Sequence, residues 1–325
     1  MPSKVTLFSG VQERLQERIA PLRAWLFPRR VFLQLEDTAI TAMALEGRRI
    51  VWLERVALPM GLCDNGEPVR TDSLGDLLGD LFVERGYAGA RVDAVLPAAA
   101  SQLRLVQWPE GRWPDDPERM LGLHEEQLAL KTALQYLDLH LVDLDGDSPS
   151  SLLVTVPSST LDRWIEVFGL AGVSLDRMEA AKPCICRGLQ PLLQQRPAGA
   201  ACVVLQLEPQ RSGLLVLEND LPAYERRMPG AEKPEAVISE LSKCLDFWHQ
   251  LRPGQLEPPL LLLHGSALTD EAQAAALAEA VGCPWQVIDP LAQGWLVDVS
   301  PEHGIHPEGP SLAPLWGLVA AGVMA

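Results

Sequence analysis

The stretch VFLQLEDTAITAMALEGRRIVWLERVALP at residues 31–59 has a counterpart later in the chain, CVVLQLEPQRSGLLVLENDLPAYERRMPG at residues 202–230. The residues Leu-Gln-Leu-Glu at 33–36 return unchanged at 205–208, an offset of 172 (205 − 33). Two further matches follow in the same order: Leu45-Glu46 with Leu217-Glu218 at the same offset, and Glu54-Arg55 with Glu225-Arg226 at 171 (225 − 54). Short matches between common residues mean little singly, but three in order on equivalent segments indicate a duplication.

Each copy is typical of three short strands joined by tight turns, followed by a helix and a further strand. In the first copy we expect strands at 31–35, 39–45, 49–58 and 92–97, with a helix at 73–85. In the second copy we expect strands at 202–207, 213–217, 221–228 and 260–264, with helices at 233–251 and 269–281. The repeated order predicts an α/β protein with two homologous halves that face each other across a cleft.

The residues between the two copies predict an inserted subdomain at about 101–157 in the first half. We expect strands at 102–108, 138–144 and 152–156, a helix at 118–137 between the first two strands, and helices at 158–170 and 179–193 after the third. The sequence QQRPA at 194–198 is the best candidate for a boundary. The chain then divides into a basic segment (1–30), a first half (31–198) and a second half (199–325).

Composition excludes several classes of function. The net charge of −16 argues against nucleic-acid binding, because affinity for phosphates comes from clustered Lys and Arg. No apolar stretch reaches the roughly 20 residues of a membrane span. The six cysteines include no C-x-x-C pair, which favours buried thiols in a reducing cytoplasm. Walker A, GxGxxG, GxSxG and HExxH motifs do not occur, so we assign no catalytic residue and no metal ligand.

The first 30 residues differ in charge from the rest of the chain. They hold six basic and two acidic groups (6 − 2 = +4) and are expected to form an amphipathic helix with Pro21 in its apolar stripe. The apolar residues that define this helix for a membrane or a partner are Leu15, Ile19, Leu22, Trp25 and Leu26. Such a helix can lie on an anionic membrane surface, bind in a partner's groove, or pack on its own domain.

Two such halves describe the actin-like ATPase fold, built from duplicated ribonuclease H-like units. The insertion and tail resemble those of the type IV pilus assembly protein PilM. The resemblance starts with the strand ending at Pro97 and the inserted helix that ends near Tyr136. It continues with the run through 154–157, 168–172 and 176–179, the segments 261–267, 282–284 and 289–290, and a last helix at 315–321.

The PilM resemblance implies a cytoplasmic protein peripheral to the inner membrane. Its expected partner is a short cytoplasmic peptide at the N-terminus of an inner-membrane pilus protein, PilN in that family. The peptide is expected in the groove between the first half and the insertion. Contact with the membrane surface, through the basic segment, is a further expectation.

The chain departs from that family where nucleotide would bind. The first phosphate loop should read Asp-Ile-Gly with a Lys further on, the second Asp-x-Gly, and the adenosine loop Gly-Gly. The corresponding residues here are Gln34, Glu36 and Thr41 for the first loop, Gln206 and Glu208 for the second, and Gly265 and Ser266 for the adenosine loop.

Each departure weakens ATP binding. A neutral Gln is a poor ligand for Mg²⁺, and a Cβ obstructs the approach of phosphate. A glutamate about 4–5 Å from a phosphate adds a repulsion of order 3–4 kcal/mol per pair of charges. We therefore expect a vestigial cleft without cofactor, in a non-catalytic pilus scaffold; ATP with Mg²⁺ is the cofactor if the loops are aligned wrongly. The alternatives are an active actin-fold ATPase or sugar-kinase-like enzyme, and a cell-division scaffold that resembles FtsA.

Overall fold

The computed structural model describes residues 29–108, 115–123, 125–128, 131–142, 150–196, 200–251, 258–299 and 306–323. The predicted N-terminal helix, with Leu15, Ile19, Leu22, Trp25 and Leu26, lies outside these residues. None of the helices in these ranges is long and apolar enough to cross a membrane.

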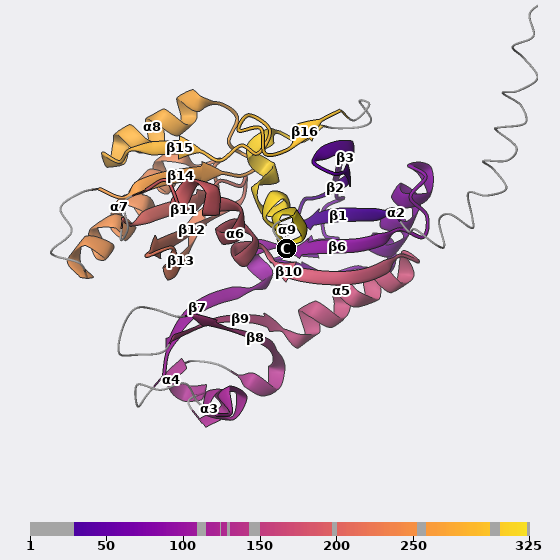
Figure 1. The fold of residues 1–325 in the computed structure, drawn as a ribbon, viewed down its shortest axis with the longest axis horizontal. Helices are drawn as coiled ribbons and strands as arrows, with labels where there is room; N and C mark the ends of the chain where they lie inside the picture. The colour runs from indigo at the N-terminus through magenta and orange to yellow at the C-terminus, as the bar shows by residue number, and fades with distance from the viewer. Residues whose placement is uncertain are drawn as a thin grey trace, which may run out of the picture.

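Two β-sheets form the body of the protein, and they share the same order over five strands when one of them is read in reverse (Figure 1). The first sheet has the order β10-β6-β1-β2-β3-β16. Its strands are β1 (Arg30–Leu35), β2 (Ala39–Glu46), β3 (Arg49–Ala57), β6 (Arg91–Leu96), β10 (Ser174–Ala180) and β16 (Val297–Asp298). The second sheet has the order β13-β12-β11-β14-β15. Its strands are β11 (Cys202–Gln206), β12 (Arg211–Glu218), β13 (Leu221–Pro229), β14 (Leu260–His264) and β15 (Trp285–Val287).

The strand register confirms the duplication and corrects one of the sequence matches. In the first sheet Gln34 lies opposite Thr41, which lies opposite Arg55. In the second sheet the corresponding row is Gln206, Gly213 and Arg227, at a constant offset of 172 (206 − 34, 213 − 41, 227 − 55). The structural counterpart of Arg55 is therefore Arg227, whereas the sequence match had paired Arg55 with Arg226. The structural equivalence is set by the pairing between strands and not by residue identity.

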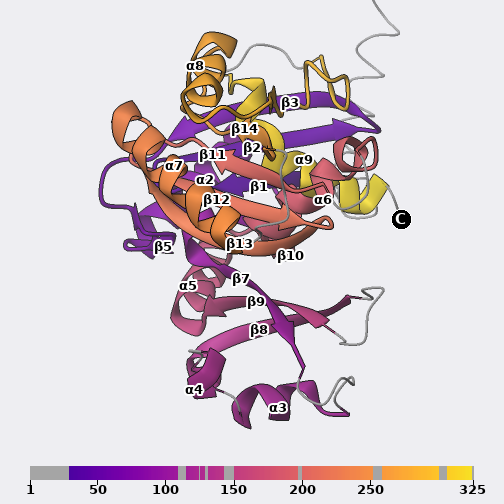
Figure 2. The same cartoon turned by 90° about the vertical axis from the view of Figure 1, so that its left-hand side faces the viewer.

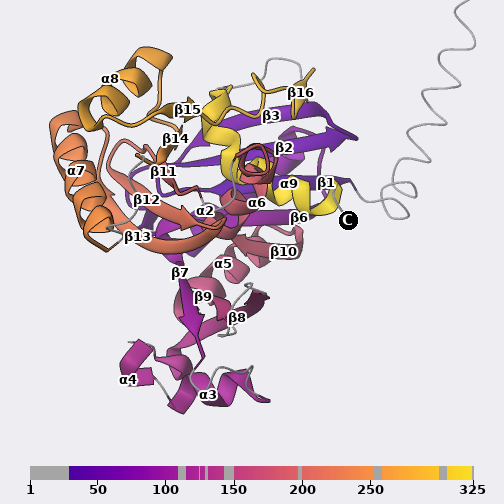
Figure 3. The ribbon, with the colours of Figure 1, turned by 60° about the vertical axis from the view of Figure 1, so that its left-hand side comes forward.

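Helices cover both faces of each sheet. On the outer face of the first sheet lie α2 (Thr71–Glu84) and α5 (Ser158–Leu170), and on that of the second lie α7 (Pro234–Leu251) and α8 (Glu271–Val281). Between the two sheets lie α6 (Ala181–Leu193) and α9 (Ala313–Val323), as Figure 3 shows. Side chains of α6 enter the cores of both halves: Cys184 packs with the first, and Ile185 and Leu189 with the second. This helix therefore joins the halves.

The tail of the chain returns to the first sheet. Strand β16 pairs with β3 in parallel, and α9 packs against β1 and β6. The short hairpin of β4 (Cys63–Asp64) and β5 (Glu67–Pro68) also belongs to the first half. The predicted boundary between the halves at residues 198 and 199 stays a prediction. The second sheet begins after this boundary, but the last residues of the chain pack on the first half.

The insertion forms a separate three-stranded antiparallel sheet, which projects from the two halves (Figures 1 and 2). Its order is β7-β9-β8, with β7 (Gln102–Gln107), β8 (Gln135–Val142) and β9 (Ser150–Pro157). The helix predicted at 118–137 is wrong. The chain instead forms α3 (Pro117–Leu123), α4 (Glu125–Leu128) and a short 3₁₀ turn, and then enters β8.

The reason for this error is the pairing of β8 with β9. From Gln135 onward the backbone pairs with β9, and Leu137 and Leu139 pack on a small core that includes Leu153. These long-range contacts outweigh the helical pattern of the local sequence. The sequence did not predict strand β10 for a similar reason. Its residues show little alternation between apolar and charged side chains, and the segment is held as a strand by its pairing with β6.

Candidate functional site

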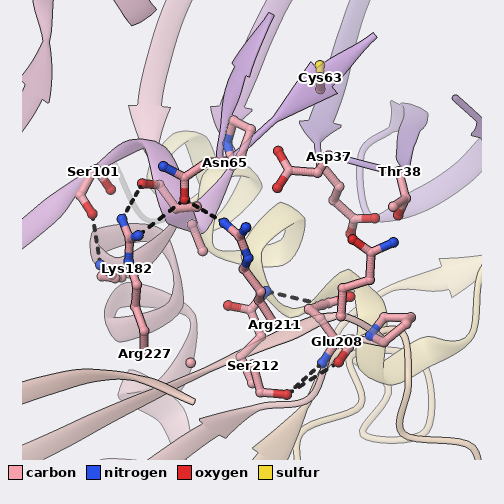
Figure 4. A pocket seen from close by; sticks show the side chains of 18 of the residues that line it. Asp37, Thr38, Cys63, Asn65, Ser101, Lys182, Glu208, Arg211, Ser212 and Arg227 are labelled. Atoms are coloured by element: carbon pink, nitrogen blue, oxygen red, sulfur yellow. Dashed lines mark hydrogen bonds between the residues drawn. The ribbon is translucent and has the colours of Figure 1, made fainter. Parts of the chain in front are cut away.

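A cavity of about 610 Å³ lies between the two halves. The first half contributes the β1–β2 turn, the β4–β5 hairpin and the residues after β6; the second half contributes the β11–β12 turn and strand β13. Helix α6 contributes Lys182 and Ile185. Figure 4 shows polar side chains from both halves pointing into this space. The cavity is thus the cleft that the duplicated sequence predicts.

The first Gln-x-Glu pair makes polar contacts with its own sheet and with Ser311 near the end of the chain. Gln34 donates from Nε2 to Glu36 (2.6 Å) and to the Ser311 carbonyl (3.1 Å). The other carboxylate oxygen of Glu36 forms an ion pair with the guanidinium of Arg55 at 2.5 Å. Thr41 is buried and accepts from the same guanidinium at 3.5 Å. The Glu36 carboxylate, which lines the cleft, is therefore neutralised from its own sheet.

The second Gln-x-Glu pair lacks that arginine. Gln206 donates to Glu208 at 3.2 Å, and Ser266 donates to the same carboxylate from its backbone N–H (3.3 Å) and from its hydroxyl. Burial and, secondarily, the negative charge of Glu36 raise the pKa of Glu208 to about 7. The two predicted phosphate loops therefore present two different carboxylates to the cleft. Glu36 is paired with an arginine, and Glu208 takes up a proton near neutral pH.

His264 lies on the same cleft-facing row, directly opposite Gln206 in the sheet. Its side chain is fully buried, and neither ring nitrogen has a hydrogen-bond partner among the described residues. Burial lowers the pKa of His264 to about 3, so the imidazole is neutral at ordinary pH. Sequence reasoning gave this histidine no role.

The predicted adenosine loop, Gly265-Ser266, comes directly after His264 in the sequence. Gly265 has a φ of +117°, and a Cβ at this position would lie 2.2 Å from the Leu207 carbonyl oxygen, so only glycine fits. All the predicted cleft residues therefore lie at or just behind the cleft wall: Glu36, Gln206 and Glu208 line the cavity, while Gln34, Thr41, Gly265 and Ser266 support it. Their role in binding stays a prediction. No group of three or more His, Cys, Asp or Glu side chains within the described ranges is arranged to hold a metal ion.

A cluster that the sequence did not predict bridges the cleft. Arg211 and Arg227, from the second half, both donate to the side-chain oxygen of Asn65 at the tip of the β4–β5 hairpin, at 2.9 and 3.2 Å (Figure 4). On the floor Lys182 pairs with Glu225 at 2.8 Å and donates to the Ser101 carbonyl at 2.9 Å. The Asn65-Gly66 dipeptide, a typical hairpin turn, was the one sequence signal for this cluster.

A second candidate site lies outside the cleft, where β8 runs beside α5 (Figure 2). Strand β8 is an edge strand of the inserted sheet. Tyr136 is 49% exposed and donates from its hydroxyl to Asp162 of α5 at 3.3 Å. Ile165, one turn further along α5, is also 49% exposed, and Leu134 before the strand is 62% exposed. We call these residues, with the exposed Asp138 and Glu166, the β8–α5 surface.

Two sheets of common order, joined by α6 around a cleft, define an actin-like α/β protein, which confirms the predicted fold class. No protein-family model and no curated protein sequence matches the chain. Among solved structures it is similar to a chain of the PilM-PilN type IV pilus biogenesis complex, with a TM-score of 0.74, 17% identity, and coverage of 91% of this chain and 98% of that one. The predicted resemblance to PilM is thus confirmed in the fold.

Two other solved structures are less similar to the chain. The ethanolamine utilization protein EutJ from Carboxydothermus hydrogenoformans has a TM-score of 0.49 and 12% identity, with 95% of this chain and 98% of that chain covered. The cytoplasmic domain of EpsL, an inner-membrane component of the type II secretion system of Vibrio cholerae, has a TM-score of 0.45 and 12% identity, with 91% and 95% covered.

Proposed function

We propose that this protein is a non-catalytic actin-like scaffold of a type IV pilus or a related secretion machine. It binds a short cytoplasmic segment of an inner-membrane partner and is thereby held at the inner face of that membrane. The observation that carries the proposal is the β8–α5 surface, which offers apolar side chains beside an edge strand. An extended peptide can add to such an edge through backbone hydrogen bonds, with side-chain pockets supplying specificity.

The charge of the β8–α5 surface indicates what kind of peptide would bind. Asp138, Asp162 and Glu166 are exposed around Tyr136 and Ile165, and the whole chain carries a net charge of −16. Cytoplasmic segments next to a membrane span are rich in Lys and Arg. A basic segment with a few apolar residues therefore complements this surface. The similarity in fold to a chain of the PilM-PilN complex supports a partner of the same kind.

The cleft supports the non-catalytic part of the proposal. At the two loop positions where the family's motif has Gly, this chain has Glu36 and Glu208, and both line the cleft. A magnesium nucleotide would bring phosphates against these carboxylates. Glu36 is already paired with Arg55, and Glu208 is already bound by Ser266, so the groups that could receive an anion at these loops are occupied.

The proposal is tested in two stages with the full chain. Immobilised protein is first incubated with detergent-solubilised membranes of its source, and the retained proteins are identified by mass spectrometry. We expect enrichment of a protein with one membrane span and a short basic cytoplasmic N-terminus. A labelled peptide of that N-terminus is then titrated by fluorescence anisotropy.

The variants Tyr136→Ala and Ile165→Ala are expected to weaken peptide binding at least about tenfold each. Phe247→Ala is the matched control, because Phe247 is 45% exposed but lies on α7 of the second half. Failure to retain any single-span membrane protein would refute the proposed function. Retention that survives both variants and is lost in the control would move the docking site elsewhere.

A further inference from the structure

Two arginines project from one face of the second sheet into the cleft. Arg227 on β13 lies opposite Gly213 on β12, and Arg211 precedes Gly213 by two residues on the same face. This register makes the two arginines diagonal neighbours, and Gly213 between them adds no side chain. In a protein with a net charge of −16, this is a local concentration of positive charge.

Neither arginine has a carboxylate partner among the described residues. Both donate to the neutral side-chain oxygen of Asn65, and Arg227 also donates to the Ala99 carbonyl at 3.4 Å. The neighbouring arginines differ: Arg55, the counterpart of Arg227 in the first half, pairs with Glu36, and Arg226 pairs with Glu240 of α7. The repeated fold therefore leaves a cation in the second half without the anion that its counterpart has in the first.

The neutral acceptor is held rigidly in place. Asn65 sits at the hairpin tip with a φ of +53°, a left-handed conformation that asparagine tolerates. The next residue, Gly66, donates its N–H to Asp37 at 2.7 Å and accepts from the Trp164 ring nitrogen at 3.0 Å. Each guanidinium has five N–H donors, and these contacts use one donor of Arg211 and two of Arg227. The remaining donors of the two groups can bind an oxyanion beside Asn65.

We propose that the cleft binds a small organic acid, whose single carboxylate or phosphate group is held by Arg211 and Arg227 against Asn65. The cavity of about 610 Å³ is of the size that holds a small molecule, and its wall includes the apolar Leu58 and Ile185. Glu36 and Glu208 line the same cavity and disfavour further negative charge. The ligand therefore has one acidic group and an apolar body. This inference does not depend on the docking function.

The probes are hexanoate and phenyl phosphate, titrated calorimetrically at low ionic strength, with 1-hexanol as the neutral control. We expect saturable binding of at least one acid, weakening with added NaCl, and no binding of 1-hexanol. The acid that binds identifies a carboxylate or a phosphate ligand. The double variant Arg211→Gln/Arg227→Gln should bind at least about tenfold more weakly. The matched control is Lys233→Gln, which makes the same kind of charge change at an exposed residue of the second half that does not line the cavity, and should bind as the wild type does.

Asn65→Asp provides a second variant that should fold at least as well. An aspartate at the hairpin tip would supply the missing carboxylate, so we expect a higher Tm and weaker binding of the acid. Absence of saturable binding of both probes to folded wild-type protein would overturn the proposal. Unchanged affinity in the double variant, or in Asn65→Asp, would overturn it as well.

Discussion

The clearest test of the cleft's electrostatics is the substitution Glu208→Gln. Glu208 is partly buried beside Ser266 and faces the charge of Glu36 across the cleft; burial, and secondarily that charge, raises the pKa of Glu208 from 4.5 to about 7. Glutamine keeps the size and a hydrogen-bonding amide but cannot ionise. The substitution therefore removes the charged form without opening a cavity.

The sign and size of the effect follow from linkage. A carboxyl group with a higher pKa in the folded than in the unfolded protein binds its proton more tightly when folded. Its destabilising contribution is absent below about pH 4.5, grows as the pH rises, and is complete above about pH 7. The shift corresponds to as much as about 3 kcal/mol. Glu208→Gln should therefore raise the free energy of unfolding by up to about 3 kcal/mol at pH 8 and have almost no effect at pH 4.5.

The assay is urea unfolding of wild type and variant at a series of pH values between 4.5 and 8. We expect the difference in free energy to increase with a midpoint between those limits. A second variant, Glu36→Gln, removes the neighbouring charge and should move the transition of Glu208 to lower pH. A difference between wild type and Glu208→Gln that is the same at every pH would refute the reasoning, because the effect would then not come from ionisation.

Two further predictions concern packing and the cleft ligand. Gly317 of α9 touches α6 so closely that an added Cβ would lie 1.7 Å from the Cys184 carbonyl oxygen. Gly317→Ala should therefore lower the free energy of unfolding by about 3 kcal/mol, whereas Gly169→Ala in α5, where an added Cβ meets open space, should raise it by about 0.5–1 kcal/mol. Equal Tm values for the two variants would contradict the observed packing of α6 on α9. ATP with Mg²⁺ at millimolar concentration is expected to leave the Tm unchanged, and a clear upward shift would instead support the ATPase or kinase alternative.

The sequence by itself determined the duplicated plan of the protein. Alternating apolar residues and turn signals are local features, so they located most strands and helices within a residue or two; β14 and α5 have the predicted bounds. The two Gln-x-Glu segments could be placed on facing walls from the repeat alone, because each lies at the end of the first strand of its half. The predicted helix at 118–137 was wrong because its second part is held as a strand by β9, which is distant in sequence.

Only the tertiary structure decided which charged groups in the cleft have no partner of opposite charge among the described residues. Arg211 and Arg227 lie 146 and 162 residues from Asn65 along the chain, and no local pattern connects them. The register of β12 and β13 places both arginines on the face of the sheet that lies toward the hairpin tip. The packing of the two halves on α6 then brings the arginines and Asn65 within hydrogen-bond distance. Pairing between strands and packing between halves are long-range contacts, so the local sequence of either repeat does not specify them.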